Sequence, residues 1–239
     1  MALPKLNDVP KYDIVIPSTK VKTKFRPYLV KEEKLLLLAM EGQNEAEIAA
    51  AIIGLLVACV DDINDPLAIT TYDMEYLFCQ LRSKSVGETS TLSILCEDVT
   101  CETRTDVTID ISKASIPDNK FENMIELNDD ITIEMKHLSY LNAQSEMLKD
   151  SNHSEVNLMR ATTIQCIAAV HTENERIEFK NETPEAIEEF VDGMTSGQFA
   201  KLTAFVNDLP ILQLDTTWKC SGCDKEQTMT LKGMNDFFQ

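Results

Sequence analysis

The sequence predicts an α+β fold, with a helical body, β-hairpins and a C-terminal zinc-ribbon-like β element. Three observations support this prediction. Several segments repeat apolar residues at helical spacing, whereas others alternate polar with apolar or β-branched residues, as strands do. Four of the seven cysteines form two close pairs, far apart in the chain, and each pair lies between two predicted strands. With 239 residues, of which 44% are apolar, the chain is long enough to bury a proper core.

The first predicted elements are a β-hairpin and a helix. Residues 12–17 and 22–30 predict two strands, because they are rich in strand-forming residues and flank a Pro-Ser-Thr turn. Residues 31–41 predict a helix that ends at Gly42. We expect Gly42 to take the left-handed conformation found just beyond many helices, which glycine adopts without strain.

Two more helices are predicted before Gly87. Asn44 is expected to cap a helix over residues 45–60, whose early glutamates suit the positive N-terminus of a helix. Residues 71–85 predict a third helix, because their apolar side chains fall on one face at helical spacing.

The pattern then changes to that of strands. β-branched residues alternate with polar ones on both sides of the segment CEDVTC, and the same pattern frames CSGC near the end of the chain. The predicted strands span residues 90–96, 103–111, 123–127, 130–136, 175–180, 212–220 and 226–231.

Helical spacing also returns in the second half of the chain. Residues 154–171 predict one long helix, for which Ser154 can serve as the N-cap. Thr183 is expected to cap another helix, with Pro184 at its first position. Residues 195–208 predict a further helix, which ends before a proline.

These elements predict a single α+β unit over residues 1–239. Residues 1–87 would form its N-terminal hairpin and helices. Residues 88–136 together with 209–239 would form the zinc-ribbon-like β part, and residues 137–208 a helical part.

The two cysteine pairs predict a structural zinc site. Cys96 and Cys101 lie at the tip of one predicted hairpin, and Cys220 and Cys223 lie at the tip of another. Zinc takes four thiolates in a tetrahedron, and a structural site of this kind has no open coordination position. Two facing hairpin tips would therefore hold Zn²⁺ as a closed clamp.

Other interpretations of these cysteines stay open. The second pair has the two-residue spacing of a zinc ribbon, but four residues separate Cys96 from Cys101. The four thiols can also stay free of metal, and a disulfide between Cys220 and Cys223 is disfavoured in a reducing compartment. A thioredoxin-type role lacks the strand–helix–strand context that it needs. The remaining cysteines lie in apolar helical segments and are expected to be core residues; they are Cys59, Cys79 and Cys166.

The charge of the chain bears on its partners. Its 40 acidic and 22 basic residues give a net charge of −18, which repels phosphate backbones, so we expect no nucleic-acid partner. A basic or neutral protein surface fits better, although the charge can also serve solubility alone. The N-terminus lacks the apolar stretch of a signal peptide, and the longest apolar run, residues 48–60, is short for a membrane span. We expect no membrane partner and a cytoplasmic location.

The sequence does not predict an enzyme. Its three histidines are scattered, and it contains no HExxH, Gly-x-Ser-x-Gly, P-loop or dinucleotide-binding motif. The carboxylate-rich runs are typical of solvated surfaces.

Two sets of residues are candidates for partner contacts. Cations in the segments FRPYLVKEEK and LRSKSVGE are expected to contact a partner or other parts of the chain, unless they are ordinary surface charges. The final aromatic residues either pack against the ribbon or offer an anchor to a partner. These candidates are Arg26, Lys31, Arg82, Lys84, Phe237 and Phe238.

Three segments carry a family resemblance. The segments KFRPYLVKEEKLLLLAME, EYLFCQLRSKSVGE and WKCSGCDKEQTMTLKGMNDFF resemble the baseplate hub assembly proteins of T-even-type, contractile-tailed bacteriophages. The resemblance covers residues 12–239, while residues 121–182 offer no motif to match. Relatives often have two residues between the cysteines of the first pair as well, so the longer spacing in this chain departs from the family pattern.

The resemblance implies a late phage protein that is not an enzyme. It would act as a chaperone-like assembly factor that binds other baseplate hub or tape-measure proteins in the host cytoplasm during virion morphogenesis. The alternative is a permanent structural subunit of the hub in the virion tail. A third class, a zinc-dependent hydrolase or redox enzyme, would need an open metal site or a reactive thiol.

Overall fold

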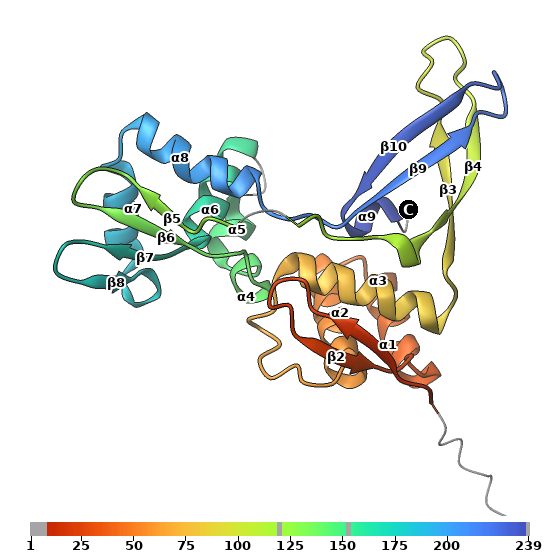
Figure 1. Ribbon diagram of the computed structural model, residues 1–239, viewed down its shortest axis with the longest axis horizontal. Coiled ribbons are helices and arrows are strands. Elements are labelled where there is room, and N and C mark those ends of the chain that lie inside the picture. The colour runs from red at the N-terminus through yellow and green to blue at the C-terminus, as the bar shows by residue number, and fades with distance from the viewer. Residues whose placement is uncertain (1–8, 119–120, 152–153, 238–239) are drawn as a thin grey trace, which may run out of the picture. The chain divides into compact units, whose positions relative to one another are not determined.

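The computed structural model describes residues 9–118, 121–151 and 154–237, without the side chains of residues 150 and 151. The chain divides into two compact units (Figure 1). Unit 1 contains Met1–Pro66, Tyr72–Pro117 and Ile211–Gln239. Unit 2 contains Leu67–Thr71 and Asp118–Pro210. The predicted mixture of helices and strands is confirmed.

Unit 1 begins with an antiparallel hairpin and a group of helices. The hairpin consists of β1 (Tyr12–Val15) and β2 (Lys22–Phe25), as the sequence predicts. The helices α1 (Val30–Glu41), α2 (Glu45–Cys59) and α3 (Thr71–Ser85) follow, close to their predicted bounds. Asn44 caps α2 as expected, because its side chain accepts hydrogen bonds from the backbone N–H groups of the first turn.

The end of α1 differs from the prediction in one respect. Gly42 keeps a right-handed helical φ of −70°, and the next residue, Gln43, takes the left-handed conformation with a φ of 50°. The turn into α2 is therefore made one residue later than the glycine rule predicts.

The rest of unit 1 consists of two antiparallel hairpins and short helices. One hairpin pairs β3 (Thr89–Leu95) with β4 (Arg104–Asp110), and the other pairs β9 (Gln213–Lys219) with β10 (Glu226–Lys232). We call these two the cysteine hairpins. The 3-10 helix η1 (Ile111–Lys113) follows β4, and α9 (Gly233–Phe237), which the sequence analysis did not predict, follows β10.

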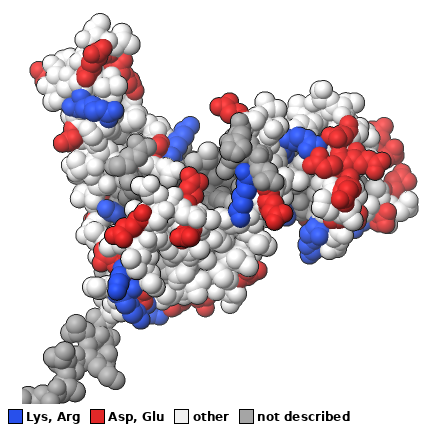
Figure 2. Space-filling model, turned by 180° about the vertical axis from the view of Figure 1, so that it is seen from behind, with Lys and Arg blue, Asp and Glu red and all other residues white. Residues whose placement is uncertain are grey.

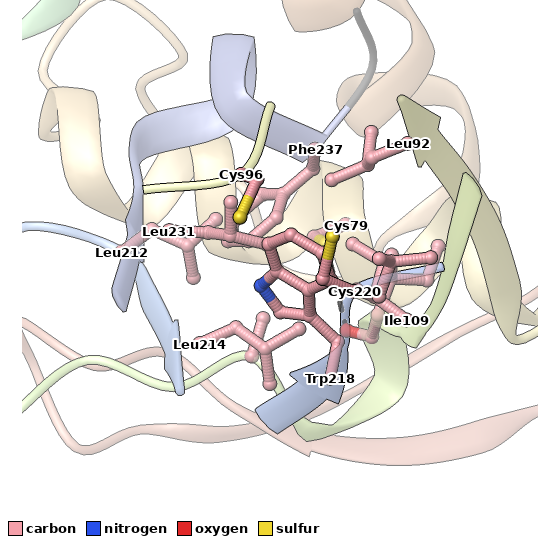
Figure 3. Close-up of a cluster of buried hydrophobic side chains, with 13 residues drawn as sticks. Cys79, Leu92, Cys96, Ile109, Leu212, Leu214, Trp218, Cys220, Leu231 and Phe237 are labelled. Carbon is pink, nitrogen blue, oxygen red and sulfur yellow. Dashed lines mark hydrogen bonds between the residues drawn. The ribbon is translucent and has the colours of Figure 1, made fainter. Parts of the chain in front are cut away.

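The cysteine hairpins share one hydrophobic core with α3. Inward residues alternate with exposed ones along the strands, as in Leu214 and Trp218 of β9. Figure 3 shows Trp218 and Phe237 pointing into this core together with leucines from three strands. Cys79 brings α3 into the same core, and its thiol donates to the carbonyl of Ile111 over 3.6 Å. Trp218 is buried in this core, just before the thiols of the second tip.

Unit 2 is built around a four-stranded antiparallel sheet in the order β5-β6-β7-β8. Helices from its second half pack against the sheet, with Ile133, Ile164 and Leu202 fully or almost fully buried in the shared core (Figure 1). The strands are β5 (Met124–Glu126), β6 (Thr132–Met135), β7 (Ile167–His171) and β8 (Arg176–Glu178). The helices are α4 (Tyr140–Ala143), α5 (Glu146–Ser151), α6 (Glu155–Gln165), η2 (Phe179–Asn181), α7 (Pro184–Asp192) and α8 (Ser196–Asn207).

Two predictions about this region need correction. The helix predicted over residues 154–171 ends at Gln165, and its last five residues form strand β7, because that segment pairs with both β6 and β8. The predicted β part over residues 88–136 ends at Pro117, since β5 and β6 join β7 rather than the cysteine hairpins. The part predicted as helical, residues 137–208, therefore contains two strands of a sheet.

Within residues 9–118, 121–151 and 154–237, no helix combines the length and the apolar character that crossing a membrane requires.

Candidate metal centre

The tips of the two cysteine hairpins meet in unit 1. Cys96 and Cys101 bracket the turn between β3 and β4, where the N–H of Cys101 donates to the carbonyl of Asp98 over 2.8 Å. Cys220 and Cys223 bracket the turn between β9 and β10, where the N–H of Asp224 donates to the carbonyl of Cys220 over 3.0 Å. Each turn therefore places two thiols at the end of its hairpin.

The four sulfur atoms form one compact group, which we call the thiol cluster. All four Sγ atoms lie within 4.8 Å of one another. The Sγ atoms of Cys96 and Cys223 are 3.7 Å apart, as are those of Cys101 and Cys220. A tetrahedral metal with metal–sulfur bonds of about 2.3 Å separates its sulfur ligands by about 3.8 Å. The thiol cluster therefore has the dimensions of a four-thiolate metal site.

These distances do not fit a disulfide. A disulfide bond is about 2.05 Å long, whereas the Sγ atoms of Cys96 and Cys223, like those of Cys101 and Cys220, are 3.7 Å apart and join one hairpin to the other. All seven cysteines of the chain are free thiols in the structure. The residues fit a metal ion held between two segments that lie more than 100 residues apart.

Hydrogen-bond donors surround the sulfur atoms. Nε2 of Gln227 donates to Sγ of Cys96 over 2.8 Å, and the side chain of Gln227 is buried. The backbone N–H of Gly222 lies 3.4 Å from Sγ of Cys220. Donors of this kind stabilise a thiolate relative to a thiol and orient it towards a metal.

The thiols of the second hairpin have divergent pKa values. Hydrogen bonds from the backbone N–H groups of Cys223 and Gly222 lower the pKa of Cys220 to about 6. A backbone hydrogen bond at Lys225 lowers the pKa of Cys223, but desolvation and the neighbouring thiols outweigh it and raise that pKa to about 12. A bound cation would replace the protons that remain, because only thiolates ligate metal.

The two tips also contact each other without a metal. The ammonium group of Lys225 forms an ion pair with Asp98 of the other tip. The N–H of Glu97 donates to Oε1 of Gln227 over 3.1 Å, and the N–H of Ser221 donates to Oγ1 of Thr105 over 3.0 Å. These contacts hold the thiol cluster together from both sides, so the site is preorganised.

The remaining cysteines lie outside the thiol cluster. Cys59, Cys79 and Cys166 are buried, and burial raises their pKa values to about 11, 12 and 12. Such thiols stay protonated and pack as small apolar side chains. Their predicted role as core residues agrees with this environment.

The four cations proposed for partner contacts make contacts within the chain. Arg26 holds Glu32 through two hydrogen bonds of 2.8 and 3.2 Å, and Lys31 lies 3.6 Å from the same carboxylate. Lys84 pairs with Glu88, and Nη1 of Arg82 lies 3.5 Å from the carbonyl of Gly87. Of the contacts expected for these four cations, the structure therefore shows those with other parts of the same chain.

For Phe237, the structure supports the first of the two expected roles, packing, over a contact with a partner. The side chain of Phe237 is fully buried in the core of the cysteine hairpins, so Phe237 is a packing residue and not an exposed anchor. The carbonyl of Phe237 accepts a hydrogen bond from Ser90 over 3.1 Å. Phe238 lies outside the described residues.

The sequence analysis missed the groups that surround the sulfur atoms. Gln227 occupies an inward position of β10, in line with Met229 and Leu231, where an apolar residue would be expected. A polar side chain at a buried position of a strand needs a hydrogen-bond partner. The glutamine in this inward row therefore indicates a polar contact next to the cysteines. Thr105 of β4 likewise stands in line with inward residues and contacts the second tip.

Comparisons with known proteins add one finding. A protein-family model described as "T4 bacteriophage base plate protein" matches residues 9–239, which is almost the whole chain. No curated protein and no solved structure matches the chain.

Proposed function

The chain belongs to the T4 bacteriophage base plate protein family, and from this premise we propose that it is an assembly factor for the baseplate hub. In this proposal it binds other hub or tape-measure proteins while the baseplate is built in the host cytoplasm, and it is released afterwards. Its chemistry is protein–protein binding and not catalysis.

One surface in unit 1 supports this proposal most directly. Beyond its first turn, helix α1 exposes four large apolar side chains, with exposed fractions between 48% and 64%. They are Leu35, Leu37, Leu38 and Met40. Apolar side chains concentrated on one helix of a folded protein are typical of a surface that a partner covers.

For the metal centre we propose zinc in a structural role. Four thiolates at tetrahedral spacing suit zinc and leave no position for a substrate or a water molecule. The ion would join the cysteine hairpins and add its binding free energy to folding. In this proposal, the cysteine hairpins held by the ion form a rigid surface for binding a partner, and they do not catalyse a reaction.

The absence of recognisable catalytic motifs from the sequence supports a binding role. None of the motifs sought, from HExxH to the P-loop, occurs in the chain. The net charge of −18 also favours partners with basic or neutral surfaces and disfavours nucleic acid.

A permanent structural subunit of the hub is the second candidate. The exposed residues of α1 support it equally well, because obligate interfaces bury large apolar areas. Quantitative mass spectrometry distinguishes the two candidates, by comparing infected cells with purified tails. An assembly factor should be abundant in the cells and absent from the tails, whereas a stoichiometric amount in the tails would contradict transient action.

The α1 surface itself can be tested by substitution. We expect a phage that encodes Leu35→Ser and Leu38→Ser to assemble few tails, while the purified variant keeps the thermal stability of the wild type. Leu141→Ser, which changes an exposed leucine on α4 of unit 2, is the matched control. Normal tail assembly with the α1 variant would count against this surface as the binding site.

A further inference from the structure

A groove in unit 2 lies along helix α8. It has a volume of about 660 Å³, and its walls come from α6, the end of α7, and α8. The residues that α8 contributes recur at helical spacing, so one whole face of this helix lines the groove. They are Ser196, Phe199, Ala200, Thr203, Ala204 and Asn207.

The floor of the groove is apolar, and small side chains along α8 leave space for a bound segment. Val191, Met194 and Phe199 supply the apolar surface, and Met194 and Phe199 are only partly buried. Ala200 and Ala204 are exposed and small. A second helix can approach α8 closely where its side chains are short, because the distance between packed helices depends on the side chains at the contact.

Of the acidic residues on α7, Asp192 lines the groove, and three more lie outside the lining on the same helix. Glu185, Glu188, Glu189 and Asp192 recur at helical spacing and therefore share one face of α7. Arg160 of α6 pairs with two of them, lying 2.7 Å from both Glu188 and Asp192. Among the described residues, Glu185 and Glu189 have no ion pair. Figure 2 shows acidic side chains gathered on unit 2, at the right in that view.

We propose that this groove binds an amphipathic helix of a partner protein that carries lysine or arginine beside its apolar stripe. The apolar stripe would pack against Phe199 and Met194, and the cations would face the carboxylates of α7. Helix α8 has 12 residues, and at about 1.5 Å per residue its face offers about 18 Å, or three turns, to such a helix. Recognition of this kind depends on anchors at positions i, i+3, i+4 and i+7 of the bound helix.

Charge argues for a different protein as the occupant. A second copy of this chain would bring a net charge of −18 against the same acidic face, which repels it. A basic helix gains both apolar burial and attraction to unpaired carboxylates. The inference builds on the proposed binding function by naming the partner segment, but it uses neither the α1 surface nor the metal centre.

Fluorescence anisotropy with the full chain tests the groove. The probe is a labelled 18-residue peptide of leucine and lysine, with the leucines on one helical face. A second peptide has the same composition with its leucines spread around the helix, and a third has glutamate in place of lysine. We expect the first peptide to bind at least about tenfold more tightly than the other two, a difference of about 1.4 kcal/mol.

Groove variants locate the binding. Ala200→Gln with Ala204→Gln fills the groove with polar side chains while keeping good helix formers in α8, and it should weaken binding of the first peptide by about tenfold. Ala186→Gln changes an exposed alanine of α7 outside the groove and should leave binding unchanged. Glu185→Gln with Glu189→Gln should weaken binding by a few fold and reduce its dependence on salt.

Three results would overturn the inference. The first is equal binding of the first two peptides, and the second is equal binding by the wild type and the Ala200→Gln, Ala204→Gln variant. The third is a dimer of the wild type in ultracentrifugation that the same variant abolishes, because the occupant would then be a second copy. Failure here leaves the α1 substitutions and the tail analysis unaffected, so the two proposals can fail separately.

Discussion

Oγ1 of Thr103 lies 2.3 Å from the position that a Cβ atom would take at Gly222. Thr103 belongs to the tip of one cysteine hairpin and Gly222 to the tip of the other. The close approach of the two tips therefore depends on the missing side chain at position 222, and the conformational freedom of glycine is not the reason for this residue.

Gly222→Ala should consequently destabilise the thiol cluster and weaken the proposed metal site. The added methyl group must push the two tips apart, at a cost of about 1–3 kcal/mol as in overpacked cores. Urea unfolding and titration with zinc should both detect the change. Gly54→Ala is the matched control, because a Cβ atom there meets nothing within 4 Å, and alanine in α2 should stabilise the chain by about 0.5–1 kcal/mol. A Gly222→Ala variant that binds zinc as the wild type does would show that the tips do not approach this closely.

Gln227 offers a second test of the centre. Gln227→Leu keeps the volume of the side chain but removes the N–H that donates to Cys96 and the oxygen that accepts from Glu97. Loss of such an outer contact typically weakens metal binding by about 10–100-fold. Competition with a chromophoric chelator measures the affinity. Thr228→Val, at the next and exposed position of β10, should have the affinity of the wild type; if both variants do, Gln227 has no part in the site.

The Arg26–Glu32 pair predicts a dependence of stability on pH. The hydrogen bonds from Arg26 lower the pKa of Glu32 from 4.5 to about 2. A carboxylate with a lowered pKa stabilises the fold above its unfolded pKa, and this contribution is lost as the pH falls through the folded value. Glu32→Gln should thus cost about 2 kcal/mol at pH 7, and the cost should disappear near pH 2.

Urea unfolding of both proteins at several pH values measures this difference. Glu41→Gln, at the exposed end of α1, serves as the control and should cost little at any pH. A difference between the wild type and Glu32→Gln that stays constant down to pH 2 would mean that the Glu32 carboxylate is not held by Arg26.

Removal of one thiol should have the largest effect. Cys220→Ser deletes a ligand of the proposed site, so bound metal should be lost and the free energy of unfolding should fall by at least about 3 kcal/mol. A strong chelator should lower the stability of the wild type but not that of the variant. Cys59→Ser alters a buried thiol outside the cluster and should keep the metal content of the wild type. A chelator that leaves the wild type unchanged would contradict a structural metal.

Local sequence patterns predicted the cysteine hairpins well, for a physical reason. Polar and apolar residues alternate along β3, β4, β9 and β10, and the inward rows end in cysteines. Such a pattern fixes which face of each strand is buried. Both tips carry thiols on the inward side, and a structural zinc site needs four such ligands. The meeting of the two tips could therefore be predicted from the sequence.

Other features depend on contacts that a local pattern does not contain. Residues 167–171 are a short apolar run, which periodicity alone cannot assign to a helix or a strand. Pairing with β6 and β8 decides that they form a strand. The division into two units likewise depends on which strands pair, and the burial of Phe237 depends on α9, which is too short to leave a periodic signal.

The most direct test of the metal centre is X-ray absorption at the metal edge, together with elemental analysis, on the protein purified without added metal. If the proposed zinc site is correct, we expect one zinc ion per chain, with four sulfur neighbours at about 2.3 Å. Protein that is folded and fully reduced but free of metal, or a metal with nitrogen or oxygen among its protein ligands, would contradict a clamp made of Cys96, Cys101, Cys220 and Cys223.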